Sequence, residues 1–312
     1  MASRRLLFHI VDVFAETAYA GNQLAVFHGD MPDDTEMQRI AREINFAETT
    51  FLLDPDTPGD THRVRIFTPE AEVPFAGHPT LGSVHVLRTV FGRGTTCGDG
   101  MWRMNLSLAA GVIPVVWSEI PDDPDAGLYS MTQRQPEFGE AVTREDAARW
   151  LGMPVGDVSD EGPCRMVSTG LPFLIVPLAS LDAVRRASLS KEGAKAAAAA
   201  CGASGVLVFA REGREPGQDL SVRVFVDELG IPEDPATGSA HGCLVAWMLQ
   251  QRSNGTGSRR QAPDGATIRL VSGQGHEIGR PSVLHLRGRF ADDRCDIEVG
   301  GRCRTVAEGR WI

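Results

Sequence analysis

A strand, a loop and the beginning of a helix occur twice in this chain, and this repeat restricts the folds that the chain can adopt. VRIF, residues 64–67, is matched by VRVF, residues 222–225, and AGHPTLGSVHVL is matched by ATGSAHGCLVAWML. The helix-opening residues Gly77 and Gly238 are 161 residues apart and the strands are 158 apart, so the second loop is three residues longer. Any α+β protein contains a few such units, but here the strands match as well as the loops. The repeat predicts two pseudo-symmetric α+β domains.

The length and one acidic segment predict where the domains meet. A chain of 312 residues is long enough for two domains of average size. The run EIPDDPDAG, residues 119–127, is acidic and contains two prolines, which is typical of a linker. We therefore expect a first domain in residues 1–118, a linker in residues 119–127 and a second domain in residues 128–301. We expect the segment after residue 301 to pack back on the first domain.

Local patterns predict several elements. Residues 6–14 are rich in β-branched and aromatic side chains, as a strand is. Apolar residues recur at helical spacing in residues 33–44, with an aspartate as the N-cap. In the second half, residues 166–178 predict a glycine turn and an apolar strand, and residues 181–201 predict one helical region.

Charge and cysteine content exclude several classes of function. With 31 basic against 41 acidic residues the net charge is −10, and no Lys/Arg run is longer than a pair, so we expect neither nucleic acid nor an anionic membrane as partner. The six cysteines are scattered without a CxxC pair, which indicates neither a zinc site nor a disulfide framework. No apolar run approaches the ~20 residues that span a bilayer. We expect a cytoplasmic protein.

The two repeated helix starts are candidate anion sites. Backbone N–H groups at a helix N-terminus lack intrahelical acceptors, and the helix dipole favours negative charge there. Gly77 and His78 open the first helix, and Gly238 and Ser239 open the second. His78 adds a titratable donor, or else closes its own loop, and Ser239 is either an N-cap or a ligand contact. The sequence thus predicts binding of a small anionic substrate.

Two carboxylates are candidates for proton transfer. Glu48 stands between Phe46 and Phe51, and a carboxylate shielded by aromatic side chains is suited to acid/base work. A solvated strand-edge glutamate is the alternative. Asp234, in IPEDPATGS, is either a second acid/base group or a loop carboxylate that accepts from backbone N–H groups.

Other motifs are excluded by their spacing. TGSAHG has Thr237 where the serine-hydrolase elbow GxSxG needs glycine, and GQGHEIG lacks the GxGxxG spacing. No P-loop occurs, and His241 and Cys243 lack a second pair of metal ligands. We therefore expect no cofactor and no metal.

Five segments together resemble one family. NFAETTFLL, IFTPEAEVPFAGHPTLG, STGLPFLIVP, EDPATGSAHGCL and QGHEIGRPS, in this order, resemble the PhzF-like family of phenazine-biosynthesis isomerases and their relatives. The resemblance implies the diaminopimelate-epimerase-like fold, with two similar domains, a mostly antiparallel sheet around a central helix in each, and a substrate cleft between them. It also implies a homodimer.

The resemblance also implies roles for named residues. The family's catalytic glutamate falls on Glu48, and its histidine and aspartate fall on His78 and Asp234. The central helix starts, at Gly77 and at Gly238 with Ser239, would hold a substrate carboxylate. The thiol-dependent epimerases of this fold use a cysteine at each helix start, and neither start here contains one.

These inferences favour a proton-shift isomerase in which Glu48 carries the proton while His78 and Asp234 orient the substrate. The first alternative is an amino-acid racemase or epimerase with Glu48 and Asp234 as opposed bases. The second is a non-catalytic binder of an anionic metabolite. The sequence names no substrate, and the segment 97–104 has no assigned role.

Overall fold

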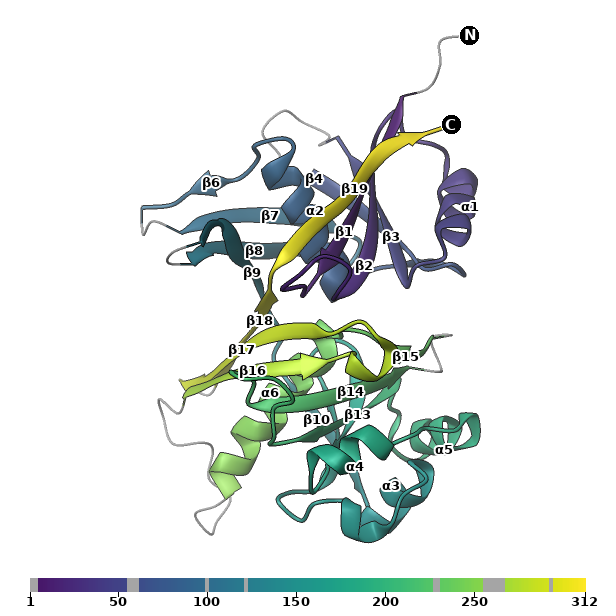
Figure 1. Ribbon diagram of the computed structural model, residues 1–312, viewed down its shortest axis with the longest axis vertical. Helices are drawn as coiled ribbons and strands as arrows, with labels where there is room; N and C mark the ends of the chain where they lie inside the picture. The colour runs from purple at the N-terminus through teal and green to yellow at the C-terminus, as the bar shows by residue number, and fades with distance from the viewer. Residues whose placement is uncertain are drawn as a thin grey trace. The chain divides into compact units, whose positions relative to one another are not determined.

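The computed structural model describes residues 5–54, 62–98, 101–120, 123–226, 231–254, 267–291 and 294–312. The chain divides into two compact units, which we call unit 1 (Met1–Met131 with Gly300–Ile312) and unit 2 (Thr132–Val299). Within each unit, strands surround a long helix (Figure 1).

Unit 1 contains two helices, within its described residues, and the strands on either side of them. The helices are α1 (Asp34–Ile44) and α2 (Gly77–Thr89). The strands are β1 (Leu6–Val13), β2 (Asn22–Gly29), β3 (Glu48–Leu53), β4 (His62–Phe67), β5 (Glu72–Val73), β6 (Thr95–Thr96), β7 (Trp102–Leu108), β8 (Gly111–Ile120), β9 (Asp123–Thr132) and β19 (Cys303–Trp311). Strand β1 pairs antiparallel with both β19 and β2, and β2 pairs parallel with β3. Strand β4 then pairs antiparallel with β3 and β5 and parallel with β7, and β7, β8 and β9 follow antiparallel.

Unit 2 repeats this plan. Its helices are α3 (Arg144–Trp150), α4 (Leu181–Arg186), α5 (Lys191–Cys201) and α6 (Gly238–Asn254), with 3₁₀ turns at Val155–Asp157 and His276–Ile278. Its strands are β10 (Glu137–Val142), β11 (Cys164–Ser168), β12 (Pro172–Pro177), β13 (Gly205–Ala210), β14 (Leu220–Val226), β15 (Ile231–Asp234), β16 (Thr267–Gln274), β17 (Ser282–Ala291) and β18 (Arg294–Gly301). Strand β11 pairs antiparallel with β10 and β12, and β12 pairs parallel with β13. Strand β14 pairs antiparallel with β13 and β15 and parallel with β16, and β16 pairs antiparallel with β17.

The order of parallel and antiparallel pairs is therefore the same in both units, which confirms the predicted repeat. VRIF lies in β4 and VRVF in β14, and Gly77 and Gly238 open α2 and α6. Each parallel pair needs a crossover connection, and helices supply it: α1 between β2 and β3, and α2 between β4 and β7. In unit 2, α4 and α5 lie between β12 and β13, and α6 lies between β14 and β16.

The domain boundary differs from the expected one. Glu119 in β8 pairs with Gly127 in β9, so the first and last residues of the predicted linker lie in paired strands of unit 1. The chain passes between the units at residues 131–132 and returns at 299–300. Proline and aspartate are common in both hairpin turns and linkers, so composition does not separate the two.

The remaining predictions concern single elements. The predicted helix 33–44 is α1, with Asp33 accepting from the N–H of Glu36 as its N-cap. The helical region 181–201 is broken into α4 and α5, because Ser190 caps a new helix after residues 187–189. No helix in the described part of the chain is long and apolar enough to cross a membrane.

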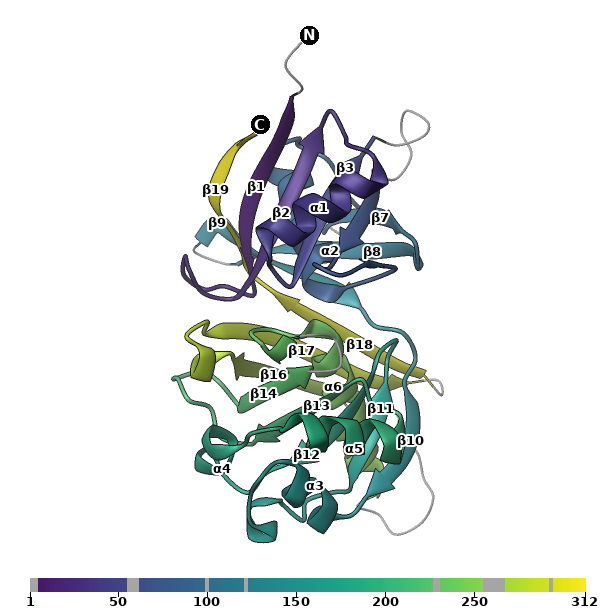
Figure 2. The same cartoon turned by 90° about the vertical axis from the view of Figure 1, so that its right-hand side faces the viewer.

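The helices α1 and α2 pack in different ways. Helix α1 lies against β3 (Figure 2). It is amphipathic and buries Met37, Ile40 and Ala41 against β-strand side chains. Helix α2 is buried along most of its length and contacts β1, β2, β3, β7 and β19, as expected for a helix without a polar face. Gly82 allows this close approach, because a Cβ there would lie 2.5 Å from a methyl carbon of Leu24.

Candidate functional site

The start of α2 is a helix N-terminus without a side-chain cap. Ala76 occupies the N-cap position in an extended conformation and makes no side-chain cap bond. Its carbonyl accepts from the hydroxyl of Thr80 at 2.8 Å. Gly77 and His78 are buried in the first turn, where backbone N–H groups have no intrahelical acceptor.

Glu48 and His78 lie next to each other in unit 1. Strand β3 begins at Glu48, and the Nε2 atom of His78 lies 3.5 Å from its Oε2 atom. The side chain of Glu48 is 18% exposed and that of His78 is 5% exposed. Burial lowers the pKa of His78 to about 3, against a smaller opposing effect of a hydrogen bond to the backbone of Gln23. The imidazole is therefore neutral near pH 7, and its contact with Glu48 is not an ion pair.

The aromatic neighbours of Glu48 in sequence do not surround it as expected. Phe51 belongs to the apolar cluster packed against α1, and Phe46 packs on the same cluster. Side chains alternate along a strand, so positions 48 and 51 in β3 face opposite sides of the sheet. On the side of Glu48, the hydroxyl of Thr50 accepts from Ser83 of α2. The shielding of Glu48 therefore comes from the α2 side.

The start of α6 carries a different set of polar groups. The Thr237 hydroxyl donates to the Oδ2 atom of Asp234, and the backbone N–H of Thr237 donates to Oε1 of Gln274 at 3.1 Å. Gly238 is buried and Ser239 is half-buried. The structure thus brings Asp234 together with the start of α6, where sequence reasoning placed it. Thr237 and Gln274 were missed as members of this group.

One turn further, α6 is held by a buried histidine. His241 bonds through Nδ1 to the carbonyl of Thr237 at 3.0 Å and through Nε2 to the hydroxyl of Ser272 at 2.8 Å. Burial lowers its pKa to about 4, so the ring is neutral near pH 7. Cys243 is also buried, and burial raises the pKa of its thiol to about 11. A protonated thiol is a poor nucleophile.

Strand register shows which positions of the two units correspond. Thr49 is opposite Phe67 in unit 1, and Val206 is opposite Phe225 in unit 2. Since Phe67 and Phe225 end the repeated tetrapeptides, Glu48 corresponds to Gly205. A Cβ at Gly205 would lie 2.8 Å from the carbonyl oxygen of Phe225 and 2.9 Å from Val226 and Phe173. Unit 2 therefore has no room for a carboxylate at the position of Glu48.

Strand register also shows which residue of unit 1 corresponds to Asp234. Ile66 is opposite Val73 in unit 1, and Val224 is opposite Asp234 in unit 2. Val73 therefore corresponds to Asp234, and each unit contributes its candidate carboxylate from a position where the other unit has a different residue.

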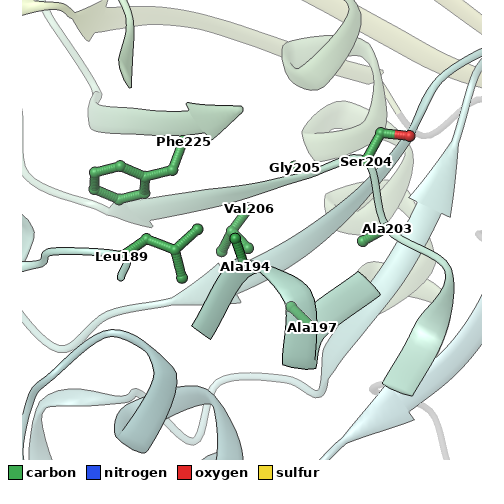
Figure 3. A pocket seen from close by; sticks show the side chains of 8 residues that line it. All are labelled: Leu189, Ala194, Ala197, Ala203, Ser204, Gly205, Val206 and Phe225. Carbon is green, nitrogen blue, oxygen red and sulfur yellow. The ribbon is translucent and has the colours of Figure 1, made fainter. Parts of the chain in front are cut away.

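In the described part of the chain, neither a group of metal ligands nor the small cavity beside α5 coincides with these residues. In the described residues, no three His, Cys, Asp or Glu side chains gather as a metal site requires. A small cavity of about 10 Å³ lies between α5 and β13 and is lined by Leu189, Ala194, Ala197, Ala203, Ser204, Gly205, Val206 and Phe225 (Figure 3). It has room for about one water molecule, so it is a packing defect and not a metabolite site.

Comparison with known proteins identifies relatives over nearly the whole chain. The family model for phenazine biosynthesis-like proteins (PhzC-PhzF) matches residues 11–309. Trans-2,3-dihydro-3-hydroxyanthranilate isomerase of Pseudomonas aeruginosa is 34% identical over 308 residues, covering 96% of this chain and 97% of that protein. An uncharacterized isomerase of Mesorhizobium japonicum is 32% identical over 321 residues, covering 99% of each.

Solved structures share the fold. A PhzF-family phenazine biosynthesis protein of Bacillus anthracis superimposes with a TM-score of 0.83 at 24% identity, covering 99% of each chain. A hydroxyproline epimerase of Agrobacterium vitis gives a TM-score of 0.59 at 13% identity, covering 99% of this chain and 92% of that one. The fold agrees with the diaminopimelate-epimerase-like α+β fold expected from the sequence.

Proposed function

Because this chain belongs to the phenazine biosynthesis-like (PhzC-PhzF) family and is an isomerase, we propose that it shifts a proton within a small carboxylate-bearing metabolite. Glu48 is the acid/base group. His78 and Asp234 orient the substrate, and the helix starts at Gly77 and at Gly238 with Ser239 bind its carboxylate.

The observation that carries this proposal is the unequal placement of Glu48. It lies 3.5 Å from the buried imidazole of His78, and the corresponding position of unit 2 is Gly205, which has no room for a side chain. A single acid/base group can remove a proton from one carbon and return it to another on the same face. Inversion at one carbon needs a second base on the opposite face.

The proposed reaction balances within the substrate. The Glu48 carboxylate takes a proton from a C–H bond, and the electron pair of that bond moves into the adjacent π system. The carboxyl then returns a proton to a different carbon, so the double bond shifts and Glu48 recovers its starting state. Helix N–H groups stabilise the negative charge that spreads toward the substrate carboxylate. Burial keeps His78 neutral, so it aligns the Glu48 carboxyl without adding a positive charge beside it.

The direct test is Glu48→Gln, which keeps the shape of the side chain and removes its ability to carry a proton. General acid–base catalysis contributes typically about 10² to 10⁴ in rate, and we expect a loss of that size in kcat. Glu43→Gln, on the exposed side of α1, is the matched control. Full turnover by Glu48→Gln on the substrate of the wild-type protein would exclude this role.

The substrate test begins with the compound named for the relatives. Trans-2,3-dihydro-3-hydroxyanthranilate combines a carboxylate with an unsaturated ring, as a proton shift requires, and the relative that acts on it is 34% identical. Incubation in deuterated water followed by NMR distinguishes the two enzyme classes. A moved double bond supports the isomerase, and inversion at one stereocentre supports a racemase with Glu48 and Asp234 as bases.

Binding without turnover is the remaining candidate. A thermal-shift screen of small carboxylates, followed by NMR of each hit, would show it as stabilisation without chemical change. We also propose a homodimer, as the family resemblance implies, and a cytoplasmic location, where cysteines stay reduced. Light scattering of the purified protein tests the dimer.

A further inference from the structure

Gln274, which sequence reasoning gave no role, is a buried amide beside Asp234. It is the last residue of β16 and is fully buried. Strand β14 lies between β16 and β15, with Val222 opposite Gln274 and Val224 opposite Asp234. This pairing brings the amide to the loop that leads from Asp234 into α6.

Two backbone groups determine which way the amide of Gln274 points. The N–H of Thr237 donates to Oε1 at 3.1 Å, and Nε2 donates to the carbonyl of Asp234 at 2.6 Å. A backbone N–H only donates and a carbonyl only accepts, so the reversed amide would break both bonds.

The same amide sets the direction of the Thr237 hydroxyl. Through its second hydrogen, Nε2 of Gln274 also donates to Oγ1 of Thr237, with 3.1 Å between the nitrogen and the oxygen, so that hydroxyl is an acceptor. Its single hydrogen then points to Oδ2 of Asp234. The hydrogen bonds therefore run one way, from Gln274 through Thr237 to a carboxylate oxygen that accepts.

Unit 1 builds the same strand, loop and helix without any of these three groups. Asp234 corresponds to Val73, and Thr237 corresponds to Ala76 at the N-cap of the central helix. Arg63 in β4 is opposite Ser107 in β7, so the next pair in register gives Leu108 as the counterpart of Gln274. The three polar residues are replaced together by three apolar ones, which indicates that they serve the site and not the fold.

We propose that Gln274 is a positioning residue for the isomerase reaction. Through Thr237 it holds the Asp234 carboxylate as an acceptor, and through the Thr237 N–H it holds the first turn of α6 in place. This inference rests on the proposed function, in which Asp234 orients the substrate.

The test is Gln274→Leu, which installs the residue found in unit 1. We expect kcat/KM to fall roughly 10- to 100-fold, the effect of misplacing a substrate-orienting group by about 1 Å. In an Asp234→Asn background the same substitution should cause little further loss, because its effect passes through Asp234. Equal losses in both backgrounds, or full activity of Gln274→Leu, would overturn the proposal.

Gln135→Leu is the matched control. The side-chain amide of Gln135 also bonds to both backbone groups of one residue: it donates to the carbonyl of Cys295 at 2.9 Å and accepts from the N–H of Cys295 at 3.0 Å. Unlike Gln274, Gln135 is exposed. Its replacement should leave kcat/KM unchanged.

Should Gln274→Leu fail to fold, Thr237 provides the same test. Thr237→Val removes the hydroxyl at nearly constant shape and should lose roughly 10- to 100-fold in kcat/KM, and Thr237→Ser, which keeps it, should lose much less. Equal losses for the two variants would contradict the proposal.

Side-chain amide NMR separates this inference from the proposed function. In the wild-type protein both Nε2 hydrogens of Gln274 should exchange slowly, and Thr237→Val should speed the exchange of one of them. Fast exchange of both in the wild-type protein would overturn the inference. A wild-type protein that converts no carboxylate would instead overturn the proposed function.

Discussion

Unit 1 begins β3 with Glu48 and leaves the start of α2 without a side-chain cap, whereas unit 2 begins β13 with Gly205 and surrounds the start of α6 with Asp234, Thr237 and Gln274. The strand order and the strand directions are nevertheless the same. The repeated frame therefore sets where two helices begin, while each unit places its candidate reactive groups independently. One unit supplies a carboxylate beside a neutral imidazole, and the other supplies a carboxylate held as an acceptor.

The largest expected effect separates the two carboxylates by role. Glu48→Gln should lower kcat by about 10² to 10⁴. Asp234→Asn should lower kcat/KM by only about 10- to 100-fold, because it misplaces the substrate without removing the proton carrier. Exchange of substrate hydrogen with deuterated water measures the difference. Equal and complete loss of exchange in both variants would favour two opposed bases.

A second comparison concerns the arginines of the repeated tetrapeptides. Arg65 pairs with Glu72 through two hydrogen bonds of 2.8 and 2.7 Å, and Arg223 pairs with Glu233 through two of 2.9 and 2.7 Å. In each unit the arginine and the glutamate lie on two neighbouring strands, β4 and β5 in unit 1 and β14 and β15 in unit 2. The pair therefore holds the segment before the central helix against the repeated strand. Both guanidinium groups also lie over the phenylalanine two residues on, at 5.1 and 4.9 Å from the ring centroids.

The two pairs differ in burial, so their removal should differ in cost. The Arg223 and Glu233 side chains are each 10% exposed, and Arg223 also donates to the carbonyls of Val184 and Ala187 at the end of α4. Arg223→Met should reduce the free energy of unfolding by about 3–5 kcal/mol, because it leaves a buried charge unpaired. Arg65→Met should cost about 1 kcal/mol, since water reaches Glu72. Urea denaturation measures the free energy of unfolding of both variants. Equal losses would show that burial does not determine how much each ion pair contributes to stability.

A third comparison tests whether unit 2 excludes a side chain at the position of Glu48. Gly205→Ala should destabilise the protein by about 1–3 kcal/mol, as overpacking does. Gly156→Ala is the control, because a Cβ there meets nothing within 4 Å. Thermal unfolding of both variants measures the effect, and an equally stable Gly205→Ala protein would remove the steric reason for the asymmetry.

The last comparison concerns a response to acid that both units share. Burial lowers the pKa of His78 to about 3 and that of His241 to about 4, below the ordinary value of 6.5. Between pH 6.5 and about 4 the unfolded chain binds more protons at these residues than the folded protein does. The free energy of unfolding therefore falls as the pH is lowered through this window, by at most about 1.4 kcal/mol per pH unit for each histidine.

Substitution of either histidine should flatten this response. The stability of His78→Asn and of His241→Asn, measured by urea denaturation at pH 7, 6 and 5, should decline less steeply than that of the wild-type protein. Curves parallel to the wild type would mean that neither residue is buried in its neutral form.

Much of the candidate site can be predicted from the sequence because its residues lie close to recognisable patterns. Gly77 and Gly238 open helices that periodicity and the repeat both predict, and Glu48, His78 and Asp234 follow from the family resemblance. Of the two environments that the sequence leaves open for Glu48, shielding by Phe51 does not occur, because strand alternation puts positions 48 and 51 on opposite faces. Gln274 gave no local signal, since its role depends on the pairing of β14 with β16, far from Asp234 in sequence.

The duplicated frame can be predicted from the sequence, because hydrophobic periodicity, helix caps and glycine turns act over a few residues and occur twice in the same order. The differences between the two copies depend on tertiary contacts. Strand register matched Glu48 with Gly205 and Gln274 with Leu108, and burial made His78 a neutral partner of Glu48. Register and burial arise from contacts between distant segments, and no short stretch of sequence contains them.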